Sequence, residues 1–273
     1  MIDVLRLIRF HNLLIAAAGV LAGGWIALAR VAAPTPLLWA ALSGVGLGAF
    51  GNTLNDVMDM QADIRNRRGD RPLATGRVEP RVARACLIGG ALVGVVAALP
   101  AGWAVSALAS GALAVMLVYS PLLKPRALLG NVAVAVVAGL PLLYGAVAVG
   151  RPGAGLVPSV LAAWIHLDRE IVKDIEDEAG DRAIGRRTLP IVLGRGRAAA
   201  VAAGVALAFI PVSLFLPYRA HYGGAYYLIA LLAQLTVLTA ASRLVAGRID
   251  RVSLLLKGAM LVGLVALVAG RVA

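Results

Sequence analysis

The chain contains nine apolar stretches of roughly 16 to 20 residues, each close to the ~20 that a helix needs to cross ~30 Å of hydrocarbon. Only Pro100 and Ala101 separate the third stretch from the fourth, which predicts a tight helical hairpin. We expect an all-α integral membrane fold of nine transmembrane helices in a single domain, residues 1–273. The stretches begin near Leu13, Leu37, Ala85, Gly102, Leu129, Val157, Ala198, Tyr226 and Leu254.

The composition agrees with a membrane protein. Of 273 residues, 60% are apolar and 15% are charged. In soluble domains about 45 to 50% of the residues are apolar and about 25% are charged. The net charge of +12 is typical of loops that face anionic lipid, so we expect membrane lipids and no nucleic acid as partners. The only cysteine, Cys86, excludes an intrachain disulfide.

The positive charges predict the orientation in the membrane. Of the 26 Lys and Arg residues, 21 lie in the N-terminal segment and in the connections that follow the second, fourth, sixth and eighth stretches. Because cytoplasmic loops carry the excess of Lys and Arg, this asymmetry predicts a multi-pass cell-membrane protein. Its N-terminus is expected in the cytoplasm and its C-terminus outside.

The acidic residues are concentrated in two places. Twelve of the 14 lie in residues 56–79 and 168–181, where the second and sixth stretches end on the predicted cytoplasmic side. A spacing of four places Asn55, Asp59 and Asp63 on one face of a helix that continues out of the second stretch.

The second segment has the same spacing at Asp177 and Asp181, which we expect on a helical extension of the sixth stretch. Like charges at this spacing repel each other, so a bound cation explains their stacking. Ligands that are all oxygen favour Mg2+. The predicted metal ligands are Asn55, Asp59, Asp63, Asp177 and Asp181, and the four aspartates are the predicted catalytic residues. Alternatively, these segments are solvated helix ends that form surface ion pairs with neighbouring arginines.

The two acidic segments form an internal repeat with an offset of 118 residues. Four predicted spans separate the copies, so the repeat is parallel and both segments can face each other across one cytoplasmic mouth. The corresponding pairs are Asp59 and Asp177, Asp63 and Asp181, Arg68 and Arg186, Pro72 and Pro190, Gly76 and Gly194, and Arg77 and Arg195.

A site of this kind has a charged mouth and an apolar interior, and an isoprenyl diphosphate has the same polarity. Mg2+ and cationic side chains stabilise negative charge on a departing diphosphate, and a water-poor pocket protects the allylic cation from hydrolysis. For the diphosphate we favour Arg67, Arg71 and Lys124, together with Lys173 beside the second acidic segment.

Two further acids and one histidine have other expected roles. Asp56 is turned away from Asp59 and can pair with an arginine, whereas Asp174 lies one turn before Asp177 on the same face. His166 could be a general base, or equally a histidine satisfied between helices, and we do not assign it to catalysis.

The chain contains three motifs, Asn55-Asp56-x-x-Asp59-x-x-x-Asp63, Arg71-Pro72-Leu73-x-x-Gly76 and Asp177-x-x-x-Asp181. Taken together, these motifs resemble the UbiA superfamily of intramembrane prenyltransferases. The resemblance covers nearly the whole chain and includes Tyr119-Ser120-x-x-Leu123-Lys124. It implies nine transmembrane helices around one central cavity, Mg2+-dependent ionisation of a polyprenyl diphosphate, and transfer to an acceptor that differs between branches.

Four further segments are Arg9-Phe10-His11-Asn12, residues 51–56, Gly130-Asn131-Val132 and residues 169–177. They are similar to the corresponding segments of the archaeal digeranylgeranylglyceryl phosphate synthases, which join a second geranylgeranyl chain to the free hydroxyl of geranylgeranylglyceryl phosphate.

Two alternatives stay open. Val57-Met58 stands where an aromatic residue is common in the family, which leaves an aromatic acceptor such as 4-hydroxybenzoate, used in quinone biosynthesis, as the main rival. A cation transporter is the alternative from another class. Its acids would be expected near the bilayer midplane rather than at helix ends among basic residues.

Overall fold

The computed structural model describes residues 1–65, 68–119 and 126–272, and only the backbone of Ala62. The helices in these ranges are α1 (Ile2–Leu7), α2 (Phe10–Leu28), α3 (Thr35–Arg65), α4 (Pro80–Ala98), the 3-10 turn η1 (Leu99–Ala101), α5 (Trp103–Val118), α6 (Leu129–Ala148), α7 (Pro152–Glu176), α8 (Glu178–Ala183), α9 (Leu189–Leu193), α10 (Arg195–Arg219), α11 (Gly224–Val245) and α12 (Val252–Val272).

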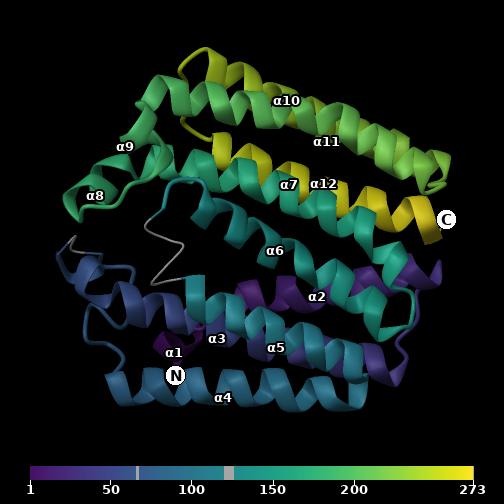
Figure 1. Ribbon diagram of the computed structural model, residues 1–273, viewed down its shortest axis with the longest axis horizontal. Coiled ribbons are helices and arrows are strands. Elements are labelled where there is room, and N and C mark those ends of the chain that lie inside the picture. The colour runs from purple at the N-terminus through teal and green to yellow at the C-terminus, as the bar shows by residue number, and fades with distance from the viewer. Residues whose placement is uncertain (66–67, 120–125, 273) are drawn as a thin grey trace.

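The long helices run side by side along the longest axis of the molecule (Figure 1). Helices α3, α4 and α5 form one half, α7, α10, α11 and α12 form the other, and α2 and α6 lie between them. Each half has its own apolar core, and α2 and α6 contribute to both cores. The short helices α8 and α9 lie at the end where α3 and α7 finish, and α12 finishes at the opposite end.

Seven helices in the described residues are long and apolar enough to cross a membrane, namely α2, α3, α4 with η1, α6, α10, α11 and α12. The predicted fourth and sixth spans correspond to α5, which is apolar but has 16 residues, and to α7, whose C-terminal half is charged. The predicted hairpin is confirmed, because η1 and Gly102 at φ 116° turn the chain from α4 into α5.

Helix α3 has 31 residues and is therefore about 46 Å long, at about 1.5 Å per residue. This length exceeds the ~30 Å of a hydrocarbon layer. The predicted continuation of the second span into a polar helix is therefore confirmed. It carries Asp59 and Asp63 toward the end of the bundle where α8 lies (Figure 1).

Glycines allow α3 to approach α4, and α2 to approach α6, very closely. A Cβ on Gly90 of α4 would lie 2.7 Å from the backbone nitrogen of Phe50 in α3, and a Cβ on Gly46 would overlap the backbone of Gly94. In the same way, Gly23 of α2 and Gly145 of α6 leave no space for a Cβ against the other helix. Backbone contact of this kind is a common means of packing helices in membranes.

The neighbouring glycines of α4 provide a matched test of this packing. We expect Gly90→Ala to lower the thermal unfolding temperature, because the added methyl must push α3 away, at a cost of about 1 to 3 kcal/mol. Gly89 has open space where its Cβ would be, so Gly89→Ala should leave the temperature unchanged or raise it slightly. Equal unfolding temperatures for the two purified variants would contradict the close α3–α4 contact.

Candidate active site

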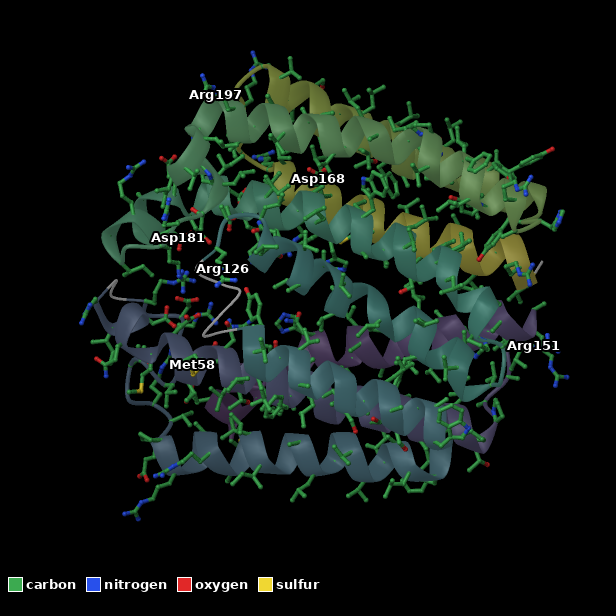
Figure 2. All side chains as sticks on the ribbon, in the orientation of Figure 1. Met58, Arg126, Arg151, Asp168, Asp181 and Arg197 are labelled. Atoms are coloured by element: carbon green, nitrogen blue, oxygen red, sulfur yellow. The ribbon has the colours of Figure 1, made fainter. Side chains whose placement is uncertain are left out.

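A pocket of about 1370 Å³ lies between the two halves and is lined by residues of α2, α3, α5, α6, α7, α10, α11 and α12. Charged side chains line it where α3 and α7 finish, and mostly apolar or small side chains line the rest, together with Gln234, Tyr144 and Tyr226. Figure 2 shows Asp181 and Arg126 at the charged end, whereas Arg151 lies at the opposite end of the bundle. The pocket therefore combines a polar mouth with an apolar interior.

The first acidic motif has the predicted local structure. Asn55, Asp59 and Asp63 all lie on α3 and all line the pocket. Burial near the end of α3 raises the pKa of the Asp63 carboxyl, an effect that the Arg71 guanidinium, with Nε 3.8 Å from Asp63 Oδ2, partly offsets.

The second acidic motif differs from the prediction. Helix α7 ends at Glu176, Asp177 is its C-cap, and Asp181 belongs to the separate helix α8. The predicted single helical extension is therefore wrong, although the Asp181 N–H still donates to the Asp177 carbonyl at 3.0 Å. Acidic residues destabilise the C-terminal end of a helix, where the helix dipole is negative, and stabilise the N-terminal end, where it is positive. Ending α7 and starting α8 within this acidic run therefore places carboxylates at the favourable N-terminal end of α8.

The two motifs meet through Arg186, which follows α8. Its Nη2 donates to Asp59 Oδ1 at 2.9 Å, and its Nη1 donates to Asp181 Oδ1 at 2.8 Å. One guanidinium thus joins an acid of the first motif to an acid of the second across the mouth of the pocket.

Arg68 is paired within its own segment. Its Nε donates to Asp70 at 3.0 Å, which lowers the pKa of the Asp70 carboxyl. The pKa of the Arg68 guanidinium is raised, first by this hydrogen bond and further by the nearby carboxylates of Asp63 and Asp177, against the effect of burial. Arg68 of the first segment and Asp177 of the second both line the pocket.

Asp56 is paired with arginines, as its orientation on the helix predicts. Its side chain is 3% exposed, and its Oδ1 accepts from Arg9 Nη2 and Arg71 Nη1, each at 2.7 Å. Arg9 and Arg71 line the pocket, whereas Asp56 does not. Asp56 therefore positions two guanidinium groups at the pocket wall and does not itself face the pocket.

Helix α7 contributes further polar groups to the pocket wall. Lys173 Nζ lies 3.3 Å from Glu170 Oε2, and Asn131 Nδ2 on α6 donates to Asp174 Oδ2 at 2.9 Å. These residues line the pocket, as does His166. Of the other predicted diphosphate ligands, Arg67 and Lys124 lie outside the described residues.

The donor set at the mouth suits a hard cation, because carboxylate and amide oxygens are the ligands that Mg2+ prefers. The position between Asp59 and Asp181 already accepts a cation, the Arg186 guanidinium. Within the described ranges, no three His, Cys, Asp or Glu side chains are arranged closely enough to hold one metal ion.

The sequence motifs include Arg186 and Arg9 but assign neither residue a role in the site. A signal was present for Arg186, since the 118-residue offset makes it the counterpart of Arg68. Its pairing with Asp59 joins residues 127 positions apart and depends on how the two halves pack.

The fold and the pocket define a membrane-embedded enzyme whose polar mouth and apolar interior suit an amphiphilic anionic substrate. The UbiA prenyltransferase family matches residues 16–269. The chain belongs to this family and is a prenyltransferase, as its sequence motifs predict.

Curated relatives cover most of the chain. A digeranylgeranylglyceryl phosphate synthase of Thermococcus gammatolerans is 40% identical over 220 residues, which are 80% of this chain and 79% of that protein. The corresponding synthase of Methanopyrus kandleri is 38% identical over 268 residues, which are 97% of each chain.

Solved structures share the fold. A digeranylgeranylglyceryl phosphate synthase structure gives a TM-score of 0.83 with 25% identity, covering 99% of this chain and 98% of that one. A UbiA homolog from Archaeoglobus fulgidus, bound to GPP and Mg2+, gives a TM-score of 0.64 with 16% identity and covers 98% of both chains. At 16% identity, the similarity to the Archaeoglobus fulgidus structure shows the fold alone.

Proposed function

We propose that this chain transfers a geranylgeranyl group from its diphosphate to the free hydroxyl of geranylgeranylglyceryl phosphate, a step of membrane ether-lipid biosynthesis. The relatives at 33 to 40% identity that are named for this reaction support the choice of acceptor. The main support for the proposal is that Arg186 binds one acid from each motif, Asp59 and Asp181, at the mouth of an apolar pocket.

In this proposal Mg2+ is held by Asp59, Asp63, Asp177 and Asp181, with Asn55 as a further oxygen ligand. When bound, Mg2+ neutralises negative charge that develops on the departing diphosphate. Arg71 and Lys173 line the same mouth and bind diphosphate oxygens through charge-assisted hydrogen bonds. Arg67 and Lys124 belong to the same proposed set.

The reaction exchanges one carbon–oxygen bond for another. The bond between the first prenyl carbon and the diphosphate breaks, and the acceptor hydroxyl oxygen forms the new ether bond to that carbon and releases its proton. The apolar lining from α2, α5, α6 and α10 to α12 holds the prenyl chain and excludes water from the allylic cation.

The architecture that we propose is one domain over residues 1–273, with nine membrane spans around the pocket, α5 and α7 included. Arg186 of the second segment contacts Asp59 of the first, and Arg68 and Asp177 line the same pocket, which supports a parallel repeat. The Lys and Arg asymmetry supports a cytoplasmic N-terminus and mouth, and an external C-terminus.

Labelling of a single cysteine tests this orientation. In a Cys86→Ala background, Asp70→Cys should react with a membrane-impermeant thiol reagent only from the cytoplasmic side, because Asp70 is exposed beside the mouth. Labelling of position 70 only from outside would refute the orientation.

An acceptor comparison tests the proposed reaction. With one donor and saturating Mg2+, transfer to geranylgeranylglyceryl phosphate should be faster than transfer to 4-hydroxybenzoate. Removing the acceptor phosphate should raise KM about 10- to 100-fold, the value of a hydrogen-bonded charge. It should lower kcat less, because the phosphate is remote from the reacting hydroxyl. Faster transfer to 4-hydroxybenzoate would overturn the acceptor and leave the prenyltransferase activity standing.

A further inference from the structure

Arg186 occupies an unusual position for a cationic side chain. It lies between the two acidic motifs and lines the pocket, and its two terminal nitrogens bind Asp59 and Asp181 separately. Asp181 is 8% exposed on its side chain, so little water is available to replace this partner. The guanidinium is therefore the main counter-ion that the described residues supply to Asp181.

The same two carboxylates are proposed Mg2+ ligands, and this produces a conflict. Mg2+ binds oxygen at about 2.0 to 2.1 Å, and a guanidinium hydrogen-bonded to the same Oδ1 atoms would be only a few ångströms from the ion. Two cations this close repel strongly in a poorly hydrated site. Arg186 and Mg2+ therefore compete for Asp59 and Asp181.

The backbone around Arg186 is held in place by hydrogen bonds, so a change of partner would come from the side chain alone. The Arg186 N–H donates to the Asp181 carbonyl at 3.0 Å, and the next residue, Arg187, forms a β-bridge with Arg126. A guanidinium on this fixed backbone can leave the carboxylates and still reach an anion in the pocket. A diphosphate bound at the mouth offers oxygens that suit it as well as carboxylates do.

We infer that Arg186 acts as an internal counter-ion that holds the acidic motifs together until Mg2+ and diphosphate displace it onto the diphosphate. This inference rests on the proposed metal site. It follows that metal alone binds weakly, because it must displace Arg186 without offering it another partner. Metal and diphosphate together bind cooperatively, because the diphosphate supplies that partner.

Two binding measurements on purified full-length protein test this role, and neither requires turnover. The first is the affinity for Mn2+ alone, followed by electron paramagnetic resonance. The second is the affinity for labelled inorganic diphosphate in excess Mg2+, measured by equilibrium dialysis. In Arg186→Gln we expect Mn2+ alone to bind about tenfold more tightly and diphosphate about tenfold more weakly, a moderate coupling for two linked ligands.

Opposite shifts distinguish this role from a structural ion pair, whose loss would weaken both affinities or leave both unchanged. Either of those results would overturn the inference. Arg182→Gln is the matched control, because Arg182 is exposed on α8 and pairs with Glu178 within the same helix. Both affinities of the control should equal those of the unaltered protein.

A conservative variant, Arg186→Lys, controls for misfolding of Arg186→Gln. Lysine keeps the charge but presents a single ammonium that cannot bridge two carboxylates as a guanidinium does. Arg186→Lys should therefore shift both affinities in the same directions by about threefold, and no shift would contradict the inference. If the unaltered protein binds neither Mn2+ nor diphosphate, the proposed metal site itself fails.

Discussion

Replacing Asp59 or Asp177 with alanine is expected to lower kcat/KM for prenyl transfer about a thousandfold. Each change removes one proposed Mg2+ ligand from a different acidic motif. The metal and its ligands are expected to contribute several kcal/mol to stabilising the departing diphosphate, and about 4 kcal/mol corresponds to about three orders of magnitude in rate. The measurement is consumption of labelled geranylgeranyl diphosphate by purified protein in lipid nanodiscs.

Asp250→Ala is the control for these variants, because Asp250 is an exposed acid at the same end of the bundle and does not line the pocket. Its activity should match that of the unaltered protein. Thermal unfolding should show that Asp59→Ala and Asp177→Ala remain folded. Near-normal rates in both alanine variants would reject a site that is shared between the two motifs.

The second large effect is expected at Asp56, and it concerns stability. Asp56→Asn removes the charge that Arg9 and Arg71 share at 2.7 Å each. Removing one member of a buried ion pair typically costs about 3 to 5 kcal/mol; here both arginines are partly exposed, so about 2 to 3 kcal/mol is expected. The thermal unfolding temperature of the purified variant should fall clearly.

A double variant separates this effect from a general loss of packing. With Arg9→Gln as well, the cost should be smaller than the sum of the two single changes, because one orphaned guanidinium is removed with its partner. Asp3→Asn is the comparison, since the pairs of Asp3 with Arg6 and Arg77 are largely solvent-accessible, and each should contribute less than about 1 kcal/mol. An unfolding temperature for Asp56→Asn equal to that of Asp3→Asn would contradict the role of Asp56.

Some features of the site could be predicted because they are local in the chain. Asn55, Asp59 and Asp63 share one helix, and their spacing of four is enough to align them. The orientation of Asp56 away from Asp59 has the same basis, and it leads to the observed pairing with arginines. The family could be recognised because its motifs consist of short runs of residues.

The break between α7 and α8 could not be predicted from residue spacing, because it depends on the electrostatics of the helix ends. Asp177 and Asp181 have the same spacing as Asp59 and Asp63, yet α7 ends at Glu176 and α8 begins at Glu178. Asp174, Glu176 and Asp177 bring negative charge to the C-terminal end of α7, where the helix dipole is also negative. Spacing shows which residues would align on a helix, but not whether the helix continues.

The sequence determines that the chain is membrane-bound and all-helical, and it determines where the acidic motifs lie. These properties depend on hydrophobicity and spacing within short segments, which do not change when the segments pack together. The cations that meet those acids depend on the packed halves of the molecule. Arg186 reaches Asp59 across 127 residues, and Arg9 reaches Asp56 across 47. Such contacts form only when close packing between helices brings distant segments together, so the pairing of charges at the mouth was decided by the tertiary structure.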